Sequence, residues 1–333
     1  MRRDALFLSD ASLLIADEGA ARILKLDRNG RALGATGRQG GGPGEFGDLI
    51  WLGPGPTGSF WAFDVDLMRL TRFDDELNLL GSVQVMIPGV VAALQPLLAL
   101  PDARLFAIPF EGRRAVVPGP FRAEVPLILL DPGAARVDTI GSWRGLEQDA
   151  SSVSGRLFPI PVGFGKRFLG AGGGERVAVG STDSLDVTVF STAGDTLMRV
   201  VGTVGARPVP EDAARRWRTL LLDGAPEGFP DIRRAWREAP IAETRPAFDG
   251  LALDGDGRLW IGESLLPADT LQTWMIFRPD GKPEAKVRLP ARFEPRPNAA
   301  PTLLDVAPDR VAVLVRSPLE ELIVEVWRIN RGI

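Results

Sequence analysis

The chain has 333 residues, of which 45% are hydrophobic and 25% charged, a composition typical of a globular protein with a buried core. Its formal net charge of -4 gives no electrostatic case for a nucleic-acid surface. The chain contains no Cys, His or Tyr. Disulfides, thiolate or imidazole metal sites, and Ser-His-Asp or Cys-His catalysis are therefore excluded.

The N-terminal residues do not form a signal peptide, because Asp4 and Asp10 interrupt their short apolar runs. Residues 79–101 carry no charge, but they are interrupted by Pro88, Gly89, Pro96 and Pro101. We interpret this segment as two buried strands with a connecting loop, and not as a membrane span.

Six β-hairpins are predicted along the chain from apolar alternation around a central polar or glycine turn. The first hairpin, residues 5–17, aligns without a gap on residues 251–263. The same pattern occurs at residues 49–64, 97–109, 169–181 and 303–315.

A further strand follows each predicted hairpin. These strands end at Asp27, Asp74, Asp131, Ser191, Arg278 and Arg328, and turn residues such as Asn29-Gly30 follow most of them. Each of them is expected to be the third strand of a four-stranded unit. Repeated units of this kind indicate a ring, because the apolar face of one unit can be covered only by the next.

Two short helices are predicted between the fourth and fifth units. The first begins after Pro210, has acidic residues in its first turn, and stops at Gly224. The second covers residues 230–238. Together they predict a helical insert.

Residues 15–46 combine three features that follow one another: a strand ending in Asp17, an R-I-x-x-x-D-x-x-G strand from Arg22 to Gly30, and a G-x-G-P-G-E-F loop ending at Phe46. This stretch resembles one NHL repeat, of the six-bladed β-propellers in the TolB-like superfamily. The resemblance implies an all-β, six-bladed propeller of four-stranded blades in a single domain, 1–333. The expected blades are 4–37, 48–85, 90–142, 167–204, 247–290 and 301–333, with the helical insert at 205–246.

The last blade is expected to be incomplete, because the chain ends just after its third strand. Propellers of this kind usually close by letting an N-terminal strand complete the last blade. We therefore expect the natural reading frame to start upstream of Met1, with the closing strand and an export signal there. The resemblance implies an extracytoplasmic location, and we expect a monomer.

The glycine-rich loop formally matches G-x-G-x-x-G from Gly42 to Gly47, but a strand and not a helix follows it, so a dinucleotide site is not indicated. We interpret it as the crossover between the first two blades, with Phe46 wedged between them.

The long loops are expected on one face of the ring, where binding residues are usually found. They are residues 37–47, 109–124, 142–166, 205–246, 263–270 and 290–301. Arginines there could grip a carboxylate, sulfate or phosphate, and tryptophans of the insert lie beside them. The candidate ligand-binding residues are Arg38, Arg113, Arg114, Arg245, Arg316, Trp217 and Trp236.

Carboxylates recur where second strands end, and a channel could bring them together around Ca²⁺ or as an acid/base pair. The candidates are Asp17, Asp64, Asp183 and Glu263. The alternative, which we prefer, is that each carboxylate caps its own turn. The metal site that gluconolactonase-like propellers form from Glu, Asn and Asp does not map onto this chain. The amidating and streptogramin lyases of similar architecture depend on His, which this chain lacks, so their activities are not expected.

The sequence therefore favours a non-catalytic propeller that presents its loop face and helical cap to a peptide, glycan or protein. The alternative is a metal-dependent hydrolase, lactonase or lyase with carboxylates at the channel mouth. A third possibility is a structural module of a larger envelope assembly.

Overall fold

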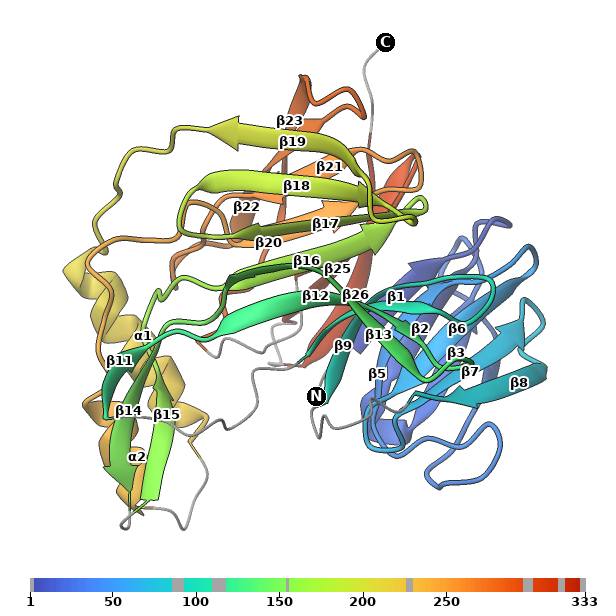
Figure 1. Ribbon diagram of the computed structural model, residues 1–333, viewed down its shortest axis with the longest axis horizontal. Helices are drawn as coiled ribbons and strands as arrows, with labels where there is room; N and C mark the ends of the chain where they lie inside the picture. Colours follow the sequence, from blue (N-terminus) through green and yellow to red (C-terminus); the bar gives the residue numbers. More distant parts are fainter. Residues whose placement is uncertain are drawn as a thin grey trace.

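The computed structural model describes residues 3–85, 93–109, 118–153, 156–225, 230–295, 302–316 and 321–329. Strands hold 54% of the chain and helices 8%, so this is a β protein. The strands form seven antiparallel sheets, five with four strands and two with three (Figure 1).

Six sheets follow one another along the chain. The first is β1 (Arg3–Phe7), β2 (Leu13–Asp17), β3 (Arg22–Leu26) and β4 (Ala32–Thr36); the second is β5 (Leu49–Pro54), β6 (Ser59–Asp64), β7 (Arg69–Asp74) and β8 (Leu79–Gln84). The third is β9 (Leu94–Ala99), β10 (Leu105–Pro109), β12 (Glu124–Asp131) and β13 (Arg136–Arg144); the fourth is β16 (Phe168–Gly173), β17 (Arg176–Ser181), β18 (Leu185–Ser191) and β19 (Thr196–Gly202). The fifth is β20 (Gly250–Leu253), β21 (Leu259–Gly262), β22 (Leu271–Phe277) and β23 (Pro283–Pro290); the sixth is β24 (Leu303–Ala307), β25 (Arg310–Arg316) and β26 (Leu322–Arg328).

The local predictions are largely confirmed. All six hairpins and all six third strands form, and the sixth sheet has three strands among the residues that the structure describes. The two helices are α1 (Glu211–Asp223), with Gly224 at its C-cap, and α2 (Pro230–Arg237).

Two predictions are corrected. The segments 109–124 and 142–166, expected to be loops, contain a seventh sheet made of β11 (Gly119–Phe121), β14 (Gln148–Val153) and β15 (Arg156–Pro161). The two strands expected to be buried within 79–101 do form, but only β9 is buried, because β8 is the outermost strand of its sheet and its Leu79 and Leu80 are exposed.

The first strands of the six sheets lie next to one another in sequence order, from β1 through β5, β9, β16 and β20 to β24, and β24 lies next to β1. A separate cluster of buried apolar side chains lies in each of the six interfaces between consecutive sheets. Burial of these faces against each other is the main source of stability.

The glycine-rich crossover positions Phe46 as predicted. Its ring is fully buried between the first two sheets, 6.2 Å from the ring of Phe73. Gly37 adopts φ +94°, and a Cβ there would lie 2.6 Å from the Phe46 ring. The crossover therefore needs glycine both for its backbone conformation and for the close approach of Phe46.

Asp64, at the end of β6, holds the other side of this crossover. Its fully buried carboxylate accepts hydrogen bonds from the N–H groups of Gly47 (2.5 Å), Asp48 (3.3 Å) and Leu67 (2.8 Å). A buried acceptor with three donors costs free energy to remove, because the donors are left without partners.

Two further carboxylates tie neighbouring sheets together. Asp4 on β1 accepts the N–H of Leu52 on β5 (2.8 Å), and Asp305 on β24 accepts the N–H of Phe7 on β1 (2.7 Å). Both residues lie on the first strands of their sheets and are only partly accessible to solvent. Burial raises the pKa of Asp4 to about 7 and that of Asp305 to about 6.

No helix among the described residues has the length and apolar character that crossing a bilayer requires.

We predict that the protein becomes less stable between pH 5 and pH 8. Asp4 and Asp305 hold protons in the folded state that the unfolded chain, with carboxyl pKa values near 3.8, has already released. The free energy of unfolding, measured with urea, should therefore fall by about 2–4 kcal/mol as pH rises through the two folded-state pKa values. The chain has no His to obscure this. The Asp4→Asn/Asp305→Asn variant should show a much flatter profile, and a flat profile in the unmodified protein would contradict the prediction.

We also predict that Asp64→Ala lowers the free energy of unfolding by about 2–4 kcal/mol, because three donors lose their acceptor. Asp17, at the same place on the first sheet, provides the matched control, since its carboxylate makes a 3.4 Å contact with the exposed Arg22. Asp17→Ala should cost about 0–1 kcal/mol in the same urea titration. Equal losses in the two variants would show that Asp64 is no structural cap.

Candidate functional site: a basic cluster beneath a helical cap

A cap formed by both helices and the three-stranded sheet β11-β14-β15 lies at one side of the molecule (Figure 1). It has an apolar cluster of its own, in which Trp217 and Leu221 of α1 meet Ile160 of β15. Phe164 and Phe293 extend this cluster, with ring centroids 5.8 Å apart. The cap is therefore a packed unit and not a pair of loose loops.

The sequence of α1 explains its place in the cap. Glu211 and Asp212 lie in its first turn, where their negative charges interact favourably with the helix dipole. Its buried face carries Ala213, Trp217 and Leu221. The Trp217 indole N–H donates to the backbone oxygen of Pro295, 3.1 Å away, which ties the helix to the segment after the fifth sheet.

The chain enters and leaves the helices through two segments that pair with each other, and we call residues 205–209 and 241–246 the stem. Pro208 and Thr244 form an antiparallel bridge, and the N–H of Arg245 donates to the oxygen of Arg207 (2.8 Å). The residue after the stem ties it to the fourth sheet, because Ala247 donates its N–H to the oxygen of Thr182, which directly follows β17 (2.9 Å).

Three cationic side chains meet at the stem, and we call them the basic cluster: Arg207 and Arg245 of the stem, and Lys166 from the segment before β16. Arg245 donates to Ser264 through Nε (hydroxyl, 3.0 Å) and through Nη2 (backbone oxygen). Arg207 donates to the backbone oxygens of Pro246 (2.9 Å) and Ala247 (3.0 Å).

Lys166 completes the cluster by donating from Nζ to the backbone oxygen (2.7 Å) and hydroxyl (3.1 Å) of Thr244. Hydroxyls and carbonyls accept all these bonds, and none of the three cations lies within 4 Å of a carboxylate of the described residues. Each group is positioned and partly desolvated while its positive charge is not neutralised by an adjacent acid.

The electrostatics of Arg245 reflect this arrangement. Burial lowers the pKa of its guanidinium, and the positive charge of Arg207 lowers it further. The more distant carboxylates of Asp269, Glu263 and Asp249 act in the opposite direction without overcoming these two effects. A ligand carboxylate, sulfate or phosphate placed between the two guanidinium groups would relieve their repulsion, and bidentate bonds to arginine are the strong form of such contacts.

Beside the basic cluster lies a neutralised pair. Arg122 binds the candidate residue Asp183 at 2.6 Å, and the Ser181 hydroxyl donates to the same carboxylate. Burial acts to raise the pKa of Asp183, but the hydrogen bonds from Arg122 and Ser181 outweigh it and keep the pKa below its usual value. Asp183 is therefore an ion-pair partner in this structure.

The other candidate carboxylates do not come together around one point. Asp64 is fully buried under the crossover, Asp17 lies beside Arg22, and Glu263 acts on Arg245 only through its charge. Among the residues that the structure describes, no group of three or more carboxylates is arranged to hold a metal ion. Any calcium site there remains a prediction.

The predicted arginines and tryptophans are spread over several places. Arg245 belongs to the basic cluster, whereas Arg38 is 81% exposed and pairs with Glu45, and Arg316 pairs with Glu294 at 3.3 Å. Trp217 is buried inside the cap, and Trp236 packs at the edge of the same cluster. Arg113 and Arg114 lie outside the described residues.

Sequence reasoning did not find Lys166, Arg207 and Ser264. One available signal was that Arg207 and Arg245 flank the two predicted helices, because the ends of an insert must lie close together. That signal predicts that Arg207 and Arg245 lie close together. It does not predict where their side chains point, because this depends on the hydrogen bonds of the stem.

No family model and no curated protein sequence matches this chain. Solved structures do resemble it. A member of the DUF4221 family from Bacteroides vulgatus is 8% identical and has a TM-score of 0.52, over 99% of this chain and 94% of that chain. The virginiamycin B lyase from Staphylococcus aureus is 9% identical with a TM-score of 0.42, over 92% and 89% of the two chains. A streptogramin B lyase is 10% identical with a TM-score of 0.43, over 98% and 93%. These neighbours are β-propeller-like proteins, and at such low identity the likeness establishes a β-propeller-like fold and no activity.

Proposed function

We propose that the chain is a single six-bladed propeller, with NHL-like repeats of the TolB-like type and with blade boundaries close to those expected from the sequence. The support is the order of contacts among the six first strands and the six apolar clusters between consecutive sheets. In this arrangement the stem and the cap belong to one face of a rigid ring, where long loops carry binding residues.

We propose further that the protein is a non-catalytic binding propeller whose cap and basic cluster take a peptide, glycan or protein ligand through an acidic group. The observation that carries this proposal is that Lys166, Arg207 and Arg245 are held by hydroxyls and carbonyls, with two guanidinium groups near each other and no adjacent carboxylate among the described residues. Preorganised, partly desolvated cations of this kind favour anion binding, because little further ordering is needed.

The competing function is a metal-dependent hydrolase, lactonase or lyase. It has less support, because Asp64 accepts three backbone N–H groups and Asp183 is engaged by Arg122 and Ser181. Those contacts occupy the oxygens that a cation would need.

We predict that Arg245→Gln and Arg207→Gln each weaken the binding of acidic probes by about tenfold or more, the cost of losing a charge-assisted bond. The probes are a hexaglutamate peptide and an oligogalacturonate, titrated by calorimetry at low and at physiological salt. Hexaglutamine and neutral oligogalactose are the uncharged controls. Arg136→Gln, which changes an exposed arginine on β13, controls for net charge and should alter binding less than about twofold.

Two results would contradict the proposal. One is equal weakening in Arg136→Gln and Arg245→Gln, which would indicate attraction by net charge alone. The other is the absence of binding by either acidic probe, combined with a melting-temperature increase in Ca²⁺, Mn²⁺ or Zn²⁺ that Asp183→Ala or Glu263→Ala abolishes, which would favour the metal-dependent enzyme.

A further inference from the structure

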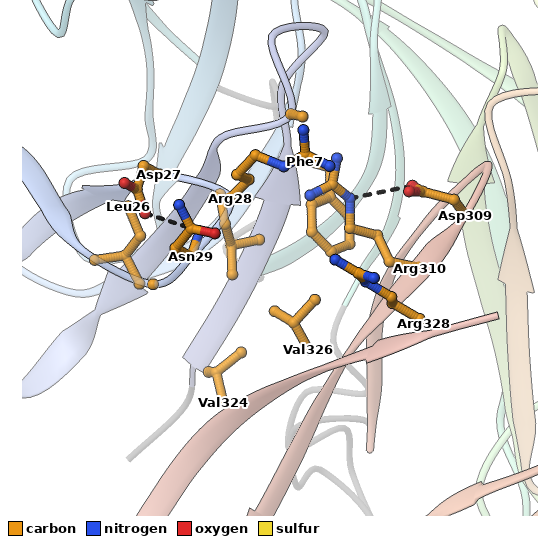
Figure 2. A pocket seen from close by; sticks show the side chains of 13 residues that line it. Phe7, Leu26, Asp27, Arg28, Asn29, Asp309, Arg310, Val324, Val326 and Arg328 are labelled. Carbon is orange, nitrogen blue, oxygen red and sulfur yellow. Dashed lines mark hydrogen bonds and ion pairs between the residues drawn. The ribbon is translucent and has the colours of Figure 1, made fainter.

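The interface between the sixth and first sheets, which we call the seam, is packed less completely than the others. Its cluster contains three buried residues among those described, Ala5, Leu13 and Ala312, whereas each of the other five interfaces has at least nine. A cavity of about 410 Å³ lies at the seam (Figure 2). The cavity is partly open to solvent, because Arg28, Val326 and Arg328 of its lining are exposed, so an extended segment could enter it from outside.

The free edge of β26 borders this cavity. The sixth sheet has the order β24-β25-β26, so β26 has no strand on its outer side among the described residues. Val324, Val326 and Arg328 of this strand line the cavity, and Val326 and Trp327 are nearly half exposed. An exposed edge with apolar side chains is a template for another strand.

The hydrogen-bonding phase of β26 shows which backbone groups are open. Ile329 donates its N–H to the oxygen of Asp309 (2.8 Å), so alternate residues from Ile323 onward point their N–H and C=O groups toward β25. The intervening residues therefore point their backbone groups away from the sheet. They include Val324, Val326 and Arg328.

The walls of the cavity are positively charged. Arg28, Arg310 and Arg328 line it together with two carboxylates, Asp27 and Asp309 (Figure 2). Arg310 stacks on the Phe7 ring, 5.2 Å from its centroid, and contacts Asp309 at 3.3 Å. Arg28 and Arg328 make no ion pair with the carboxylates that the structure describes.

The carboxylate of Asp27 does not neutralise these arginines. It accepts the N–H groups of Arg31 (2.9 Å) and Asn29 (2.8 Å), and these bonds lower its pKa and fix it within its own turn. The cavity therefore keeps an excess of positive charge above an apolar floor that includes Leu13 and Val324.

We propose that the seam is a second binding site, in which an extended acidic segment of a partner polypeptide pairs with the open edge of β26. The segment adds a fourth, antiparallel strand to the sixth sheet. Its apolar side chains fill the cavity between the two sheets, and a Glu or Asp side chain binds Arg28 and Arg328. Main-chain bonds supply affinity and the arginines supply selectivity, as in other cases of strand addition.

The test uses two blocked nine-residue peptides in which Val and Thr alternate, one with two central glutamates and the other with two central glutamines. The glutamate peptide should bind about tenfold or more tightly than the glutamine peptide, measured by calorimetry. Hydrogen exchange should show new protection at the amides of Val324, Val326 and Arg328 when the glutamate peptide is bound.

Variants separate the main-chain contacts from the charge contacts. Val326→Pro removes an outward N–H without disturbing the hydrogen bonds to β25, and it should weaken the binding of the glutamate peptide about tenfold. Val326→Thr keeps the N–H and should bind within about threefold of the unmodified protein. Arg28→Gln, at an exposed turn position, should reduce the difference in affinity between the glutamate and glutamine peptides.

Equal binding of the two peptides, or undetectable binding of both, would overturn the proposal. So would protection of the β26 amides that develops without peptide as the protein concentration rises, because a second copy of the chain would then be the occupant. Sedimentation velocity over the same concentrations identifies that outcome.

Discussion

The structure depends on one constraint: the two apolar faces of each sheet can be covered only by the sheets before and after it. Six clusters of buried side chains meet this requirement, and Phe46 shows how the chain does so between the first two sheets. The constraint also makes the ring cooperative, because opening any interface exposes two faces to water. The seam is the interface with the fewest buried apolar side chains among the described residues. Asp305 of the sixth sheet bridges it by accepting the N–H of Phe7 on the first sheet. Burial of a carboxyl at that point couples the closing of the ring to pH.

A rigid ring has consequences for binding. The stem of the insert is fixed to the fourth sheet through Ala247 and Thr182, and the cap is fixed through its own apolar cluster. Side chains on the stem are therefore held in place by the scaffold, which reduces the ordering that a ligand must impose. The most recognisable part of the sequence, the glycine-rich crossover, contributes to packing, whereas the binding proposed here lies in parts that differ from one sheet to the next.

Much of the fold could be predicted from the sequence, because hairpins, third strands and helix ends depend on neighbouring residues. Apolar alternation identified all six hairpins, and Gly224 marked the end of α1. The cap sheet was missed because β11 is only three residues long and pairs with β14, which lies well beyond it in the sequence. The exposure of β8 was missed because apolar composition does not reveal which strand is outermost. The basic cluster could be predicted only through Arg245, since the orientation of Lys166 and Arg207 depends on Thr244 and on the stem backbone.

The most direct test of the account is a nuclear Overhauser measurement across the seam at pH 5, on selectively labelled protein. A ring closed between the sixth and first sheets predicts a contact between the amide proton of Phe7 and the β protons of Asp305, and a similar contact between the amide proton of Leu52 and the β protons of Asp4. If the Leu52 contact is observed and the Phe7 contact is absent, the first two sheets are neighbours but the ring is not closed, which would contradict the central claim.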